Sequence, residues 1–465
     1  MLKTMLDGAI FTIKYIIDMG ASVMLPIIIA ILSIVVGVGP GKAVRAGLMI
    51  GVGFVGLNLI VTLMNDQLGP AAQAMSERFG LSLTIIDQGW PGISPAAWAS
   101  QIAYVAIPLA VAINVVMLLL KLTKVVNVDI WNIWHFTFTG AIAYVVTGNY
   151  WIGMLGVAIH AIVAYKLGDI WAPVMEEYFE LDGITVPHGD SAFMGPYAVF
   201  VDWLIDRIPV LRDVDINADT LQEKIGVFGE PVVIGFALGA IIGLLAGYDV
   251  AGFLKLGVNM AAVMVLMPKI VKCIMDGLMP LTESAKKVMN ERFGGEQYYI
   301  GLDPAILLGD SQVVTAGLIF IPITLLLAII IPGNRVLPFG DLATIGFFIA
   351  IAVGIHKGNL FRTLFSGTLI MSIIIWIANQ TVDWVTALGT STGIFTLAPG
   401  AQIAALDQGG WPITYVFTSI CSMQNLVSVI LITGSYVACL VMSVRFSKRR
   451  AAEVAAARKD EDDEL

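Results

Sequence analysis

Three polar residues that could bind a hydroxyl-rich ligand recur at every third position of one short stretch. Asp129, Asn132 and His135 are spaced so that they lie along one face of a helix. Carboxylate, amide and neutral imidazole groups together donate and accept hydrogen bonds, which is what a ligand made of hydroxyl groups requires. The competing interpretation is that this face pairs with a neighbouring helix, with Asp129 at a membrane interface.

The other histidines stand in different surroundings. His188 lies between a proline and a glycine, and we expect it either to hold a turn or to contact a ligand from a re-entrant loop. His160 stands alone on an apolar stretch, which favours a packing role. His356 precedes Lys357 at the end of an apolar stretch, which favours a side chain that reaches the lipid headgroups.

The sequence contains no motif for a catalytic metal or phosphate site. There is no glycine–lysine phosphate loop, no aspartate-rich magnesium motif and no cluster with metal-ligand spacing. The three cysteines, Cys273, Cys421 and Cys439, lie in or beside apolar stretches and offer no disulfide framework. We therefore expect no catalytic residue, no metal and no cofactor, and no phosphorylation site on this chain.

The composition indicates that a lipid bilayer, not water, surrounds most of the chain. Of its 465 residues, 58% are hydrophobic and 13% are charged, whereas soluble domains are about 45–50% apolar and about 25% charged. So few charges could not cover the apolar surface of a water-soluble fold of this length. The composition excludes an ordinary soluble enzyme, and we expect lipid contacts and no nucleic-acid partner.

A helix needs about 20 mostly apolar residues to cross a bilayer. We predict an all-α integral membrane fold with about eleven transmembrane helices, after an amphipathic helix over residues 1–19. The apolar segments near 80–98 and 297–308 are broken by Gly and Pro, so we expect two re-entrant segments there. The predicted spans are residues 20–38, 46–64, 99–120, 133–148, 151–168, 232–247, 253–272, 311–332, 342–356, 363–380 and 413–442.

Polar and aromatic residues gather beside the two broken segments. Non-helical backbone at membrane depth is tolerated where protein buries it or where it lines a cavity, and inverted-repeat transporters bind substrate where two such segments meet. We therefore expect residues from both segments in a binding site, although an aspartate there can instead cap a short helix. The candidates are Asp87, Gln88, Trp90, Trp98 and Gln101 from the first segment, and Asp303, Asp310 and Gln312 from the second.

The sequence also contains an internal repeat. The stretch SERFG at 76–80 returns as NERFG at 290–294, an offset of 214 residues, and flanking matches keep an offset of 210 or 214. Each half holds an odd number of predicted spans, so the second copy enters the membrane upside down. The predicted parts are an amphipathic helix (1–19), a first repeat (20–168), an acidic cytoplasmic linker with a possible re-entrant segment (169–231), a second, inverted repeat (232–380), a loop with the eleventh span (381–445) and a charged tail (446–465).

Basic residues predict the orientation of the chain. Loops rich in Lys and Arg stay in the cytoplasm, and the cluster Arg445, Lys448, Arg449 and Arg450 therefore places the C-terminus there. With about eleven spans the N-terminus lies outside. The acidic residues after Lys459 are typical of a solvated, disordered end.

Several longer motifs resemble one family of bacterial transporters. They are DQGWPG (87–92), WASQIA (98–103), VVNVDIWNIWH (125–135), PHG (187–189), GEP (229–231), GLDPA (301–305), VLPFGDLATIGFF (336–348) and DQGG (407–410). From about residue 10 to 445 the chain resembles the membrane (IIC) subunit of galactitol-type permeases of the bacterial phosphoenolpyruvate-dependent sugar phosphotransferase system, in the ascorbate/galactitol permease superfamily.

The resemblance implies a function, a location and partners. It implies a homodimer in the bacterial inner membrane that moves a polyol inward, galactitol ahead of arabitol or xylitol. A separate cytoplasmic IIB subunit, supplied by IIA, then phosphorylates the polyol. The rival function is an ion-coupled secondary transporter of a polyol or sugar acid, in which Asp129 or His135 would relay protons.

Overall fold

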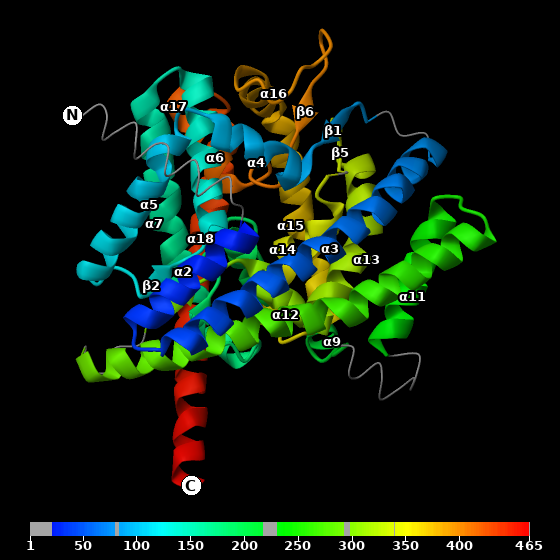
Figure 1. The fold of residues 1–465 in the computed structure, drawn as a ribbon. Helices are drawn as coiled ribbons and strands as arrows, with labels where there is room; N and C mark the ends of the chain where they lie inside the picture. Colours follow the sequence, from blue (N-terminus) through cyan, green and yellow to red (C-terminus); the bar gives the residue numbers. More distant parts are fainter. Residues whose placement is uncertain (1–20, 80–82, 217–229, 293–297, 339, 465) are drawn as a thin grey trace.

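The computed structural model describes residues 21–79, 83–216, 230–292, 298–338 and 340–464. The helix expected over residues 1–19 lies outside these ranges. Helices dominate the fold (Figure 1). They are α2 (Ala21–Val35), α3 (Pro40–Arg78), α4 (Gly89–Ala99), α5 (Ala103–Leu119), α6 (Ile130–Thr147), α7 (Tyr150–Glu177), α8 (Gly195–Ile205), α9 (Pro209–Arg212), α11 (Pro231–Leu245), α12 (Val250–Arg292), α13 (Ser311–Ile330), α14 (Ile345–Ile355), α15 (Leu360–Gln380), α16 (Val382–Ser391), α17 (Pro412–Ser422) and α18 (Leu426–Glu464), with the 3-10 helices η1 (Ala192–Met194), η3 (Pro304–Gly309) and η4 (Leu342–Thr344).

Capping residues explain where several helices begin and end. The side chain of Asn149 accepts hydrogen bonds from the backbone N–H groups of Trp151 and Ile152 at 3.0 and 3.4 Å, so α7 begins at Tyr150. Just before it, Gly148 ends α6 with φ of 67°, a left-handed conformation that glycine adopts without strain. One Gly-Asn pair therefore stops one helix and starts the next.

Several helices of the described chain are long and apolar enough to cross a membrane. Four helices do so by themselves, namely α7, α13, α15 and α18 as far as Ala456. Helices α4 and α5 meet the test together but are bent by 96° at their break. This bend, in the Gly- and Pro-rich first segment, makes the segment a broken span or a re-entrant loop. The total of about eleven spans stays a prediction.

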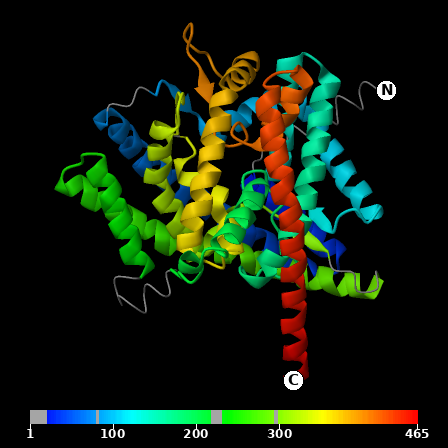
Figure 2. The same ribbon diagram turned by 180° about the vertical axis from the view of Figure 1, so that it is seen from behind.

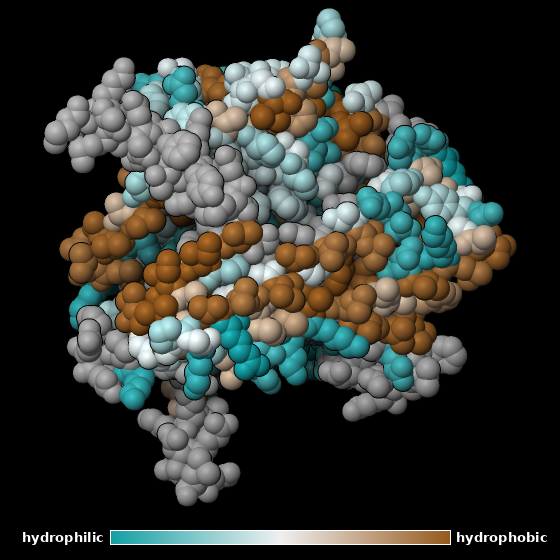
Figure 3. Space-filling view, in the orientation of Figure 1, coloured by the Kyte–Doolittle hydropathy of each residue, from teal (hydrophilic) through white to brown (hydrophobic). Residues whose placement is uncertain are grey.

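Helices α3 and α12 are far longer than a bilayer is thick. They contain 39 and 43 residues, or about 58 and 65 Å at 1.5 Å per residue, against a hydrocarbon core of about 30 Å. They pack together and cross one side of the molecule obliquely (Figure 1). A band of hydrophobic residues crosses the same face (Figure 3). The segments 46–64 and 253–272, which were predicted as spans, are therefore sections of longer helices that run obliquely across the molecule.

Short parallel strands correct the prediction of an all-α fold. Strands β5 (Val336–Leu337), β1 (Ile85–Asp87) and β6 (Ile403–Ala404) form sheet A, in that order. Strands β2 (Val125–Asn127), β4 (Tyr299–Gly301) and β3 (Ile184–Thr185) form sheet B. The middle strands, β1 and β4, belong to the two broken segments. Pairing satisfies their backbone N–H and C=O groups, which lipid could not do.

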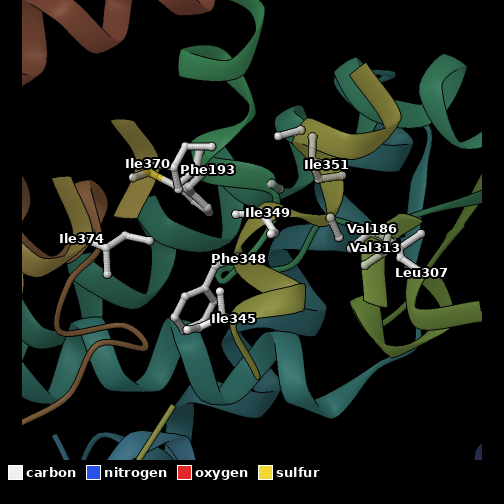
Figure 4. Packing of buried hydrophobic residues seen from close by; sticks show 14 of the residues in the cluster. Val186, Phe193, Leu307, Val313, Ile345, Phe348, Ile349, Ile351, Ile370 and Ile374 are labelled. Atoms are coloured by element: carbon white, nitrogen blue, oxygen red, sulfur yellow. The ribbon is translucent and has the colours of Figure 1, made fainter. Parts of the chain in front are cut away.

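The core is centred on α14, which is buried along its length except at Phe347. Its residues Ile345, Phe348 and Ile349 lie among side chains that include Phe193 of η1 and Ile374 of α15 (Figure 4). A Cβ atom on Gly317 of α13 would lie 3.0 Å from the Cα of Gly346 in α14. The two helices therefore approach more closely there than larger residues would allow.

The observed elements differ from the predicted parts in three places. The segment predicted as linker 169–231 includes the end of α7, and its residues from 184 to 199 are buried in β3, η1 and α8. The predicted span 413–442 consists of α17 and α18, joined where Met423 and Asn425 have φ of 58° and 53°. The tail 446–465, which we expected to end in disorder, is helical to Glu464, and α18 projects beyond the rest of the molecule (Figure 2).

Candidate functional site

Two histidines from distant parts of the sequence meet in the interior. His135 lies on α6 and His188 follows β3, and their ring centroids are 4.2 Å apart. Both side chains are buried. The Nδ1 atom of His135 accepts a hydrogen bond from the backbone N–H of Gly189 at 3.2 Å. The proton of a neutral His135 ring therefore lies on Nε2, which becomes a donor.

Each histidine faces carboxylates. The Nε2 atom of His135 lies 3.5 Å from Oδ2 of Asp407, and Nε2 of His188 lies 3.3 Å from Oδ2 of Asp303. On its other side, Nδ1 of His188 lies 2.5 Å from Oδ1 of Asp190. The result is a row in which the two neighbouring imidazole rings lie between a carboxyl group at each end, from the carboxyl end of β6 to that of β4. We call Asp407, His135, His188 and Asp303 the central row.

Asp129 and Asp303 each come two residues after a strand of sheet B and begin a helix. The Oδ1 atom of Asp129 accepts from the N–H of Trp131 at 3.1 Å, and that of Asp303 from the N–H of Ala305 at 2.7 Å. One carboxylate oxygen of each residue therefore caps a helix, as the alternative interpretation of these aspartates proposed. The Oδ2 atom of Asp129 is buried without a hydrogen bond. Asp129, His188 and Asp303 each bring one potential ligand atom within 4.8 Å of the others.

The carboxylate of Asp87 accepts hydrogen bonds from backbone N–H groups around sheet A. Its Oδ1 atom accepts from the N–H groups of Gly89 and Leu406 at 3.1 and 2.9 Å, and its Oδ2 atom from that of Asp341 at 3.0 Å. Asp341 in turn accepts from the N–H groups of Trp90 and Asp407 at 2.9 and 2.8 Å. Asp87 therefore positions Asp407 through Asp341 and through the loop that precedes Asp407.

The remaining predicted site residues have separate contacts. Trp90 packs its ring edge-on against Trp131, with centroids 5.3 Å apart. Asn132 is buried and donates to Oδ1 of Asn127 at 2.6 Å. Gln101 is exposed at the bend between α4 and α5.

Asp310 and Gln312 lie together at the start of α13. The Oδ1 atom of Asp310 accepts from the N–H groups of Gln312 and Val313 at 2.8 and 3.0 Å, and its Oδ2 atom accepts from the hydroxyl of Tyr178 at 3.1 Å. These bonds tie the start of α13 to Tyr178, the residue that follows α7. Helix capping is therefore one of the roles of Asp310.

Sequence reasoning missed three residues of this region. They are Asp190, Asp407 and Gln408. Gln408 has φ of 58°, an uncommon conformation for a residue other than glycine, and its Nε2 atom donates to Oδ1 of Asp407 at 2.9 Å. The signal that could have found the last two is the motif DQG at 407–409, which repeats residues 87–89.

The other two histidines have structural contacts. His160 is buried between Phe136 and Phe193 and its Nδ1 atom lies 2.8 Å from the hydroxyl of Thr139, in line with a packing role. The prediction for His356 is wrong. This residue is buried rather than directed at headgroups, with its ring nitrogens 3.0 Å from Asp202 and 2.9 Å from Ser366.

The family model described as "PTS system sugar-specific permease component" (EIIC-GAT) matches residues 15–399. The chain belongs to this family. It is 55% identical over 432 residues to the "PTS system galactitol-specific EIIC component" of Escherichia coli strain K12 and to that of strain O157:H7, covering 93% of this chain and 95% of each relative. It is 38% identical over 403 residues to a "Putative permease IIC component" of strain K12, covering 86% of this chain and 92% of that relative.

Membership in this permease family indicates what kind of ligand the central row could bind. An EIIC-GAT permease is a multi-pass bacterial membrane protein that carries a sugar-type substrate and works with IIB and IIA partners. The row offers imidazole donors and carboxylate acceptors in a buried setting, where each polar contact is stronger than in water. Such a site can recognise an uncharged ligand through its hydroxyl groups alone.

Proposed function

We propose that the substrate of this permease component is a sugar alcohol, with galactitol as the first candidate, bound along the central row. The proposal rests on the arrangement of His135 and Asp407. Nε2 of His135 faces Oδ2 of Asp407 at 3.5 Å but makes no hydrogen bond within the described part of the chain. A hydroxyl that accepts from the imidazole and donates to the carboxylate satisfies both groups. The relatives named for galactitol, at 55% identity, support this substrate class.

The substrate reaches this site by movement of the protein. The side chains of His135, His188 and Asp407 are at most 4% exposed, so a polyol enters only when surrounding elements separate. We propose rigid-body motion of the part that carries the two sheets. The polyol is then phosphorylated by IIB. The cysteines of this chain lie on helices α12, α17 and α18, which supports a separate phosphocysteine carrier.

The inverted repeat is part of the same proposal. If β1, β2 and β3 correspond to β4, β5 and β6, the order β5-β1-β6 of sheet A becomes β2-β4-β3, which is the order of sheet B. This supports two related halves that extend as far as α8 and α17. We infer a cytoplasmic C-terminus and an external N-terminus from the basic residues. We infer a homodimer from the family resemblance.

A labelling experiment tests the inversion. Single cysteines at Lys42 and Arg335, in a variant without the native cysteines, are expected to react with a membrane-impermeant maleimide from opposite sides. Lys42 should react from the cytoplasm, because the basic residues near it keep that loop inside. Reaction of both positions from one side would contradict the inverted repeat.

An uptake experiment separates group translocation from the ion-coupled rival. In sealed vesicles, galactitol uptake is expected to require IIB and a phosphoryl donor and to continue after the proton gradient is collapsed. The product should be the phosphate ester, because phosphorylation drives accumulation. Accumulation of free galactitol driven by a pH gradient alone would support an ion-coupled transporter instead.

A further inference from the structure

Three potential metal ligands converge at one edge of sheet B. Asp129, His188 and Asp303 follow strands β2, β3 and β4, which run parallel, so all three residues leave the sheet at its carboxyl edge. One ligand atom from each residue lies within 4.8 Å of the other two. Ligand atoms about 2.0–2.3 Å from one ion would be separated by at most about 4.6 Å, so small movements bring this set onto a common centre.

The second polar atom of each of the three side chains is already occupied. The Oδ1 atoms of Asp129 and Asp303 accept from the N–H groups that begin α6 and η3. The Nδ1 atom of His188 lies 2.5 Å from Oδ1 of Asp190. A carboxylate that holds one ring nitrogen and leaves the other free is the usual support of a metal-binding histidine. Each side chain is thereby oriented with one atom available.

Two of the available atoms make no hydrogen bond to the residues that the structure describes, and the third, Oδ2 of Asp303, lies 3.3 Å from Nε2 of His188. Among the described residues, Oδ2 of Asp129 and Nε2 of His188 are buried atoms without a hydrogen bond, and Asp129 is 1% exposed. An unsatisfied carboxylate oxygen in the interior is costly. Asp129 and Asp303 also line a cavity of about 20 Å³, which is enough for one water-sized particle.

We propose that Asp129, His188 and Asp303 bind one divalent transition-metal ion of the Mn²⁺ or Zn²⁺ type. One imidazole with two carboxylates suits these ions better than Mg²⁺, which prefers oxygen ligands and its own water shell. Three protein ligands leave coordination positions open. Given the proposed function, polyol hydroxyl groups take these positions and are held by the ion as well as by the central row.

Metal binding by the purified full-length protein tests the proposal. The protein in detergent is freed of metal with a chelator and titrated with Zn²⁺ by calorimetry and with Mn²⁺ by electron paramagnetic resonance. One equivalent is expected to bind, and Asp129→Asn and His188→Gln are each expected to weaken binding at least tenfold. Asp249→Asn is the matched control, since this aspartate also accepts a hydrogen bond from a helix-start N–H group, that of Gly252 in α12, but lies outside the set, and the variant should bind normally.

Two results would overturn the metal site. One is the absence of stoichiometric binding by the native protein. The other is binding of equal strength by Asp129→Asn and the native protein. Melting curves identify unfolded variants: the ion should raise the melting temperature of the native protein and of Asp249→Asn, but not that of Asp129→Asn. If Asp129→Asn alone is stabilised and no metal binds, a proton occupies the site and the proposal fails.

Polyol binding separates this inference from the proposed function. Galactitol affinity is measured on the native protein with and without the metal, and a loss of at least tenfold on chelation is expected. Equal affinity in both conditions would overturn the role of the ion in ligand binding and leave the proposed function intact. Absence of galactitol binding in both, together with stoichiometric metal binding, would overturn the proposed substrate and leave the metal site intact.

Discussion

The two sheets place aspartates at comparable points, yet these aspartates have different environments. At sheet A, both oxygens of Asp87 and of Asp341 accept hydrogen bonds from backbone N–H groups. At sheet B, Asp129 and Asp303 each use one oxygen in this way and direct the other toward His188 or into the interior. The difference indicates that sheet A fixes the loops, whereas sheet B offers free ligand atoms. Residue type and position after a strand do not distinguish these roles.

The largest expected effect is on stability, at sheet A. Asp87→Ala leaves the N–H groups of Gly89, Leu406 and Asp341 without their acceptor. Each buried unpaired donor costs about 1–3 kcal/mol, so the loss should be at least about 3 kcal/mol. Thermal melting in detergent measures it, with Asp383→Ala on the exposed start of α16 as a control that should change little. A normal melting curve combined with lost galactitol binding would instead assign Asp87 to ligand contact.

A smaller effect, on affinity, is expected in the central row. His135→Ala and Asp303→Ala each remove a hydrogen bond to a neutral hydroxyl, worth about 0.5–1.5 kcal/mol, and more if a buried partner is left unpaired. Galactitol affinity measured by calorimetry should therefore fall a few-fold to tens of fold. His160→Ala is the control, because this residue packs between two phenylalanines; it should lower the melting temperature more than the affinity. The reverse pattern would mean that the site lies elsewhere.

The smallest effect is expected at the bend between α4 and α5. The sequence predicts Gln101 in the binding site, but its side chain is exposed where the two helices meet. We expect Gln101→Ala to change galactitol affinity less than twofold, within the usual effect of a surface substitution of about 0.5 kcal/mol. A tenfold loss of affinity would show that the bend closes over the ligand during transport.

The sequence allowed prediction of features that depend on local pattern. The apolar helices and the broken first segment follow from hydropathy and from Gly and Pro, and the preference of Asp for helix starts made capping the alternative role for Asp303. The spacing of the polar residues also singled out His135, and the flanking proline and glycine singled out His188. Their contact was not predictable, because it depends on the pairing of β3 with β4 and of β4 with β2, and strands of two or three residues carry too little pattern.

The misplaced residues have the same physical explanation. His356 was judged by its neighbour Lys357, whereas its burial depends on Asp202 of α8, which is 154 positions earlier in the chain. Asp407 and Gln408 were missed because their motif lies outside the register of the repeat at 20–168 and 232–380. The pairing of β6 with β1 brings that stretch to His135.

The pairing of strands across the whole chain has a consequence for how the protein is made. Ile86 in β1 pairs with Ile403 in β6, 317 residues later. Ribosomes add about 5–20 residues per second, so β1 is synthesised roughly 15–60 s before this partner exists. An unpaired strand cannot rest in lipid, because each exposed N–H or C=O group costs several kcal/mol there. The first broken segment therefore takes its final position late in biogenesis. Until then its backbone needs polar surroundings, either water or the interior of the insertion machinery.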